Sequence, residues 1–123
     1  MVGSKWYEYL NKSKLTPPDW VFGVVWPILY VLIGLSMYFN KPQKDDIKLI
    51  TFFSLQMFFN LIWTTIFFKL QMPRLALFDL FLTLLFTILY FIESIDLSKY
   101  LLIPYILWLL LAFYLNAYIV YKN

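Results

Sequence analysis

The sequence of 123 residues contains no cysteine and no histidine. Without cysteine there are no disulfide bonds, no thiolate metal ligands and no thiol nucleophile. Without histidine the chain lacks the commonest metal ligand and the usual general base. A metal site would have to be built from only seven carboxylates, so we predict no metal site, no required cofactor and no catalytic residue.

Charge is also scarce, because charged residues make up 14% of the chain against roughly 25% in soluble proteins. The ten Lys and Arg residues form no basic run, which argues against a nucleic-acid partner. Hydrophobic residues reach 63%, more than one core in so small a chain can bury. The composition therefore predicts that much of the surface faces lipid.

Four apolar stretches are each close to the ~20 residues that cross a bilayer as a helix. They are Trp20–Phe39, Leu49–Phe68, Leu75–Ile92 and Tyr100–Tyr121. The connections are short, so we expect consecutive helices to be antiparallel neighbours and both termini to lie on one side. The predicted fold is an all-α integral membrane protein, with residues 20–123 forming an antiparallel bundle of four transmembrane helices.

Residues 1–19 differ from these stretches because charged side chains interrupt their aromatic residues. The segment lacks the continuous apolar core of a signal peptide, and its aromatic rings suit the headgroup layer, so we expect it to lie at the membrane interface. Six of the ten basic residues fall on the side of the termini: Lys5, Lys12, Lys14, Lys69, Arg74 and Lys122. This bias predicts that both termini are cytoplasmic, but it does not identify the membrane.

Each predicted helix carries a stripe of small, polar or aromatic residues at helical spacing. The stripes are Gly23, Trp26, Tyr30 and Gly34; Gln56, Asn60 and Thr64, with Trp63 beside them; Asp79, Thr83 and Thr87; and Tyr105, Trp108, Ala112 and Asn116. If the four faces converge, they enclose a cavity with aromatic walls and a few hydrogen-bonding groups. Such a cavity suits a large, flat, mostly apolar ligand.

Each stripe also has a purely structural interpretation. Polar side chains often join membrane helices without any ligand, and Gly23 and Gly34 are typical of close helix contacts. Asp79 follows Arg74 by five residues and could pair with it or cap a loop. Trp26 and Trp108 could face lipid or fill the core. Leu115, Tyr118 and Lys122 match a loose pattern proposed for cholesterol contact, but tyrosine and lysine also anchor helix ends.

Several segments, in this order, resemble the TspO/MBR family of tryptophan-rich sensory proteins and translocator proteins. They are Trp6-Tyr7, Leu15-Thr16-Pro17-Pro18, Val21-Phe22-Gly23-Val24-Val25-Trp26, Asn60-Leu61-Ile62-Trp63, Pro73-Arg74-Leu75-Ala76-Leu77-Phe78-Asp79, Leu102-Ile103-Pro104-Tyr105-Ile106-Leu107-Trp108 and Leu115-Asn116. The similarity extends from Trp6 over essentially the whole chain, and the ordered set is more specific than any one segment.

The resemblance implies a binding site as well as a fold. Members of the family bind porphyrins such as haem, and in animals cholesterol and benzodiazepine-type ligands; some bacterial members promote light-dependent porphyrin breakdown. By resemblance, a loop with Tyr7, Pro17 and Pro18 would cap the pocket. Its lining would be Trp26, Tyr30, Asn60, Trp63, Asp79, Trp108 and Ala112, and the family's sterol motif would correspond to Leu115, Tyr118 and Lys122. Trp26 and Trp108 would stack on the ring, and Lys12, Lys14 or Arg74 would meet its acidic groups.

Family members have five helices, and by this comparison the four spans are equivalent to helices two to five. The chain is then a natural four-helix relative, a truncated product, or a chain that takes the missing pocket wall from a second subunit, as in a homodimer, or from lipid. The leading functional hypothesis is a membrane receptor for a flat hydrophobic ligand, most readily a porphyrin or haem, otherwise a sterol, acting in tetrapyrrole handling or stress sensing. The alternatives are a structural or assembly protein without a ligand, and light-dependent porphyrin degradation.

Overall fold

The computed structural model describes residues 19–40 and 46–122. Its elements are α2 (Asp19–Asn40), α3 (Ile47–Thr64), the π-helical segment η1 (Thr65–Lys69), α4 (Pro73–Glu93) and α5 (Asp96–Lys122). The four predicted spans are confirmed, and the helices begin one to four residues earlier and end one residue later than predicted. The predicted interfacial segment lies outside the described residues, apart from Asp19.

All four helical stretches, with α3 and η1 counted together, are long and apolar enough to cross a membrane. Large apolar side chains point outward along each of them; Val31, Leu61, Phe78 and Leu107 are all more than half exposed. An exposed apolar surface on four helices of this length suits the hydrocarbon core of a bilayer. The composition and the structure thus both indicate that lipid surrounds the helices.

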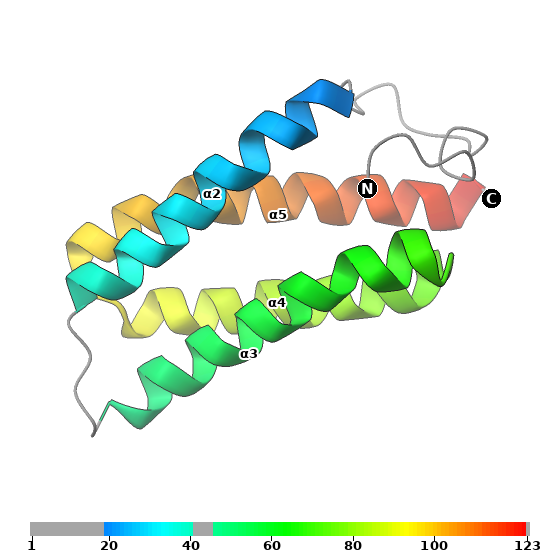
Figure 1. Ribbon diagram of the computed structural model, residues 1–123. Helices are drawn as coiled ribbons and strands as arrows, with labels where there is room; N and C mark the ends of the chain where they lie inside the picture. Colours follow the sequence, from blue (N-terminus) through cyan, green and yellow to red (C-terminus); the bar gives the residue numbers. More distant parts are fainter. Residues whose placement is uncertain (1–18, 41–45, 123) are drawn as a thin grey trace.

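The helices do not all pack in chain order. Close approaches join α3 to α4, α4 to α5, and α2 to α5, whereas α2 and α3 are consecutive but barely touch. Figure 1 shows α2 lying along α5, and α3 along α4. The expectation that every pair of consecutive helices would be neighbours is therefore wrong for α2 and α3. The reason is that α2 buries Leu29 and Ile33 in a cluster that includes Leu102, Tyr105 and Leu109 of α5.

One end of α2 is fastened to α4 and α5 by a group of polar side chains. Tyr90 lies 2.9 Å from the hydroxyl of Ser36, and the Asn40 amide donates to Tyr90 and to Ser94, both at 3.1 Å. Ser98 donates to the Ser36 carbonyl at 2.6 Å. Because unpaired polar groups are costly in hydrocarbon, these contacts fix α2 firmly at this end.

Candidate functional site

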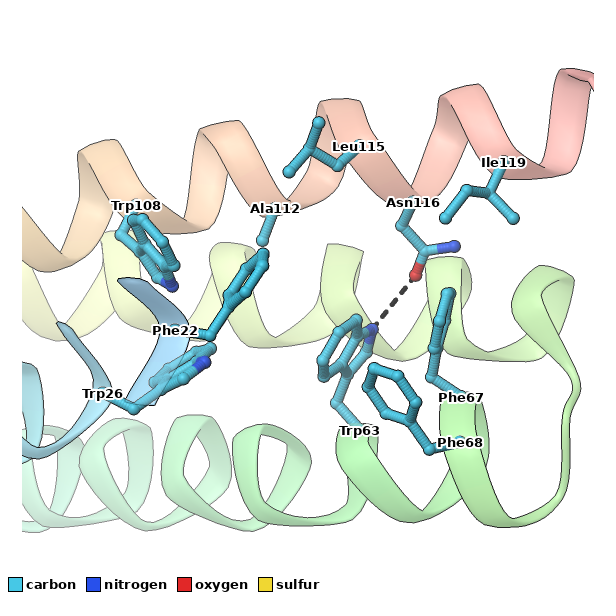
Figure 2. A pocket seen from close by; sticks show the side chains of 10 residues that line it. All are labelled: Phe22, Trp26, Trp63, Phe67, Phe68, Trp108, Ala112, Leu115, Asn116 and Ile119. Carbon is cyan, nitrogen blue, oxygen red and sulfur yellow. Dashed lines mark hydrogen bonds between the residues drawn. The ribbon is translucent and has the colours of Figure 1, made fainter. Parts of the chain in front are cut away.

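A cavity lies between α2, the end of α3 with η1, and α5 (Figure 2). Its volume is about 40 Å³, enough for only a few water molecules and well below the ~300–1,000 Å³ of ligand pockets. Its lining is Phe22, Trp26, Trp63, Phe67, Phe68, Trp108, Ala112, Leu115, Asn116 and Ile119. We refer to it as the inner cavity. Six of these ten side chains are aromatic, so the walls are mainly flat rings.

The rings form two groups that face each other across the inner cavity (Figure 2). In the first, Phe22 and Trp26 each meet Trp108 edge to face, with ring centroids 5.5 Å and 6.1 Å apart. In the second, Trp63 stacks on Phe67 at 5.2 Å and meets Phe68 edge-on at 6.0 Å. These offset contacts hold the rings in place, so the cavity offers a preformed aromatic surface to a ligand.

Two polar groups lie in the wall of the inner cavity: the Asn116 amide has hydrogen-bond partners, and the Trp108 indole N–H has none. Asn116 accepts from the Trp63 indole at 3.0 Å and donates to the Pro73 carbonyl at 3.0 Å, which ties α5 to α3 and α4. The buried Trp108 Nε1–H has no hydrogen-bond partner, and Figure 2 shows this indole directed toward Phe22 and Trp26. A ligand with an acceptor atom would therefore satisfy Trp108.

Phe67 and Phe68 contribute to the cavity because α3 ends in a π-helical turn. Neighbouring residues of an α-helix point about 100° apart, so only one of two consecutive rings would be expected to face a given cavity. In η1 the Leu70 N–H donates to the Thr65 carbonyl at 2.9 Å, the five-residue spacing of a π-helix. Both rings line the inner cavity as a result.

A second cavity opens between α2 and α3, and we call it the seam cavity. Its volume is about 350 Å³, within the range of ligand pockets, ~300–1,000 Å³, and it is lined by Phe22, Gly23, Trp26, Pro27, Tyr30, Asn60, Trp63 and Thr64. Tyr30 donates to Asn60 at 2.6 Å, Asn60 donates to Tyr105 at 2.8 Å, and Tyr105 donates to Gln56 at 2.9 Å. This chain of hydrogen bonds crosses the bundle at mid-helix, from α2 through α3 to α5 and back.

Asp79 is buried but lines neither cavity. It is 2% exposed and neither carboxyl oxygen has a hydrogen-bond partner. The suggested pairing with Arg74 does not occur, since Arg74 is exposed. In the same helix the Thr83 hydroxyl donates to the Asp79 carbonyl and Thr87 to the Thr83 carbonyl, so this stripe is mostly satisfied within its own backbone.

Apart from Asp79 and the sterol pattern, the predicted site residues fall into three sets. Trp26, Trp63, Trp108 and Ala112 surround the inner cavity. Tyr30 and Asn60 line the seam cavity, where Trp26 and Trp63 also appear. Tyr7, Pro17 and Pro18 lie outside the described residues.

The three residues of the sterol pattern lie along α5 at helical spacing but differ in exposure. Leu115 is buried and lines the inner cavity, whereas Lys122 is exposed at the end of α5. The Lys122 ammonium lies 6.0 Å from the ring centre of Tyr118 and 5.3 Å from that of Tyr121, contacts typical of cation–π pairs. The sterol assignment itself stays a prediction.

Sequence reasoning missed Phe22, Phe67, Phe68 and Ile119 as cavity residues. Helical spacing could have found two of them, because Phe22 precedes Trp26 by four positions and Ile119 follows Asn116 by three. No pattern in the sequence predicts the π-helical turn that places Phe67 and Phe68 in the cavity wall.

The fold and cavity define a multi-pass integral membrane protein with an aromatic pocket between its helices. The chain belongs to the TspO/MBR family, which matches residues 1–122. It is 37% identical to the tryptophan-rich protein TspO of Archaeoglobus fulgidus, over 96% of this chain and 80% of that protein. It is 31% identical to the tryptophan-rich sensory protein of Cereibacter sphaeroides, over 91% of this chain and 73% of that protein. It is 30% identical to the Homo sapiens translocator protein, over 98% of this chain and 76% of that protein.

Proposed function

We propose that this protein is a membrane receptor for a flat, hydrophobic tetrapyrrole, a porphyrin or haem, which binds in the seam cavity against the aromatic side chains that this cavity shares with the inner cavity. The observation that carries the proposal is this shared aromatic wall of Phe22, Trp26 and Trp63, beside a cavity of about 350 Å³. Aromatic faces favour offset stacking with a conjugated macrocycle. The names of the relatives, which refer to sensing and translocation, support a receptor more than an enzyme.

Two polar features fit the edge of such a ligand. The unpaired Trp108 Nε1–H can donate to a carboxylate or carbonyl oxygen. Arg74 is exposed and follows Pro73, whose carbonyl holds Asn116 of the cavity wall. A guanidinium at this rim can form a charge-assisted hydrogen bond with a propionate group.

The test is a titration of the purified protein in detergent with protoporphyrin IX, following tryptophan fluorescence and melting temperature. We expect saturable quenching and a rise in melting temperature, because a ligand at 100 times its Kd stabilises the folded state by about 2.7 kcal/mol. Trp26→Phe combined with Trp108→Phe should weaken binding. The matched control is Trp20→Phe, since Trp20 is 70% exposed and lines neither cavity.

Absence of saturation and of any thermal shift would contradict the receptor proposal. It would favour a scaffold whose polar side chains only join helices, as Asn60, Tyr105 and Gln56 do here. We further propose that both chain ends face the cytoplasm, on the basis of the excess of Lys and Arg on that side.

A further inference from the structure

The Asn116 side chain of α5 is 2% exposed, and both polar atoms of its amide have partners. Its Nδ2 donates to the Pro73 carbonyl of α4 at 3.0 Å, and its Oδ1 accepts from the Trp63 indole of α3 at 3.0 Å (Figure 2). A carbonyl can only accept, so Pro73 holds the amide nitrogen on its own side. The Asn116 oxygen is therefore left facing Trp63, which can only donate.

The hydrogen bond to Asn116 selects one orientation of the Trp63 ring. Phe67 stacks on this ring with the planes 23° apart, and Phe68 meets it edge-on. These apolar contacts restrict the plane of the indole, but they do not distinguish its polar edge from its apolar edge. A half-turn about the last side-chain torsion would carry the N–H away from Asn116 and leave two buried polar groups without partners. The polar contact thus decides which edge of Trp63 faces α5.

Asn116 reaches the seam cavity only through Trp63. Trp63 lines both cavities, whereas Asn116 lines the inner cavity and not the seam cavity. We propose that Asn116 is a positioning residue for the ligand site: it fixes the orientation of the Trp63 ring, and with it the aromatic face that the seam cavity presents to a planar ligand. This inference rests on the proposed function for its ligand, but not for the orientation of the ring.

Two substitutions separate the hydrogen bond from the space that Asn116 fills. Asn116→Leu has a similar size and accepts no hydrogen bond, and Asn116→Ala is a smaller replacement for use if leucine fits poorly. Asn116→Asp keeps an acceptor oxygen for Trp63 in either protonation state, so it should restore the orientation. The control for a general loss of stability is Ser98→Ala, which removes a buried hydrogen bond to the Ser36 carbonyl in a residue that lines neither cavity.

The first readout needs no ligand. In a nitrogen–proton correlation spectrum of the protein in detergent, each tryptophan gives one indole signal, and the signal that disappears in Trp63→Phe is that of Trp63. Hydrogen bonding moves an indole proton to higher frequency, so Asn116→Leu should move the Trp63 signal to lower frequency. Asn116→Asp and Ser98→Ala should not. A Trp63 signal that stays in place in Asn116→Leu would overturn the proposal.

The second readout is the Kd of protoporphyrin IX, measured by tryptophan quenching. We expect Asn116→Leu to raise Kd about fivefold, the order of one offset aromatic contact. Asn116→Asp should bind nearly as tightly as the unmodified protein, and Ser98→Ala should bind equally well despite a lower melting temperature. An unchanged Kd in Asn116→Leu, or an equal rise in Ser98→Ala, would refute the positioning role. If the unmodified protein binds no porphyrin, the proposed function fails, and the indole spectrum alone decides whether Asn116 orients Trp63.

Discussion

At the scale of single residues, Tyr105 is central to the series of hydrogen bonds that links α2, α3 and α5 inside the bundle. Its side chain is fully buried, and its hydroxyl accepts from Asn60 and donates to Gln56. The ring also belongs to the main apolar cluster. One residue thus fills the core and satisfies two amide groups of α3, a combination that phenylalanine cannot reproduce.

Tyr105→Phe should lower the free energy of unfolding by about 1–3 kcal/mol, because it leaves the buried Asn60 amide and the Gln56 carbonyl oxygen without this partner. Tyr100→Phe removes the same hydroxyl from a side chain that is 71% exposed in the same helix and should have little effect. The measurement is thermal unfolding in detergent. Equal melting temperatures for the two variants would contradict the structural role of the hydroxyl.

Among the residues that the structure describes, Asp79 has the least satisfied polar atoms, because neither carboxyl oxygen has a hydrogen-bond partner. Replacement by threonine preserves its size and lets the new hydroxyl donate to the carbonyl four residues earlier, as Thr83 and Thr87 already do. Asp79→Thr should therefore raise the melting temperature, with a gain in free energy of about 1 kcal/mol. A marked loss of stability would mean that the carboxyl group has a partner among molecules bound from solution.

At the scale of elements, α2 is held unevenly along its length. Ser36 and Asn40 tie one end to α4 and α5. Toward the other end α2 makes contacts between rings, such as Phe22 with Trp108, and Pro27 interrupts the backbone hydrogen bonds. The two halves of this one helix therefore differ in local stability.

Hydrogen–deuterium exchange should detect this difference. Amides of residues 20–28 should exchange faster than those of residues 32–40, because local opening of the first half breaks fewer buried hydrogen bonds. In α4, which packs against both α3 and α5, we expect no comparable gradient between its halves. Uniform exchange along α2 would contradict the one-sided attachment.

The sequence was sufficient to predict the four spans, because long apolar runs have few alternatives to a membrane helix. It also placed Trp26 and Trp108 near each other, since both lie on stripes that face inward. It could not predict that α2 packs on α5 and not on α3. A short connection limits how far apart two helix ends lie, but side-chain fit decides which faces meet.

At the scale of the whole molecule, the end of α2 at Asp19 and the end of α5 at Lys122 lie at the same end of the bundle (Figure 1). The turn before α4, with Met72, belongs to this end, because Asn116 near the end of α5 holds the Pro73 carbonyl. The turn before α5 lies at the opposite end. One orientation in the membrane therefore fixes the side of every connection.

Single cysteines should report this orientation. Met72→Cys and Leu97→Cys place thiols at opposite ends on side chains that are 47% and 49% exposed. With cytoplasmic termini, a membrane-impermeant maleimide should label Leu97→Cys in intact cells and Met72→Cys only after permeabilisation. The reverse pattern would invert the proposed topology.

The distribution of hydrogen bonds also bears on how the protein is made. During synthesis α2 and α3 leave the ribosome before α4 and α5, yet within the described residues they share one hydrogen bond. The partners of the Asn60 amide nitrogen and of the Gln56 carbonyl oxygen are Tyr105 and Thr87, both supplied by the later pair. Until α4 and α5 are inserted, α2 and α3 therefore expose these polar groups within the bilayer. During this interval membrane chaperones and quality-control proteases would compete to bind them.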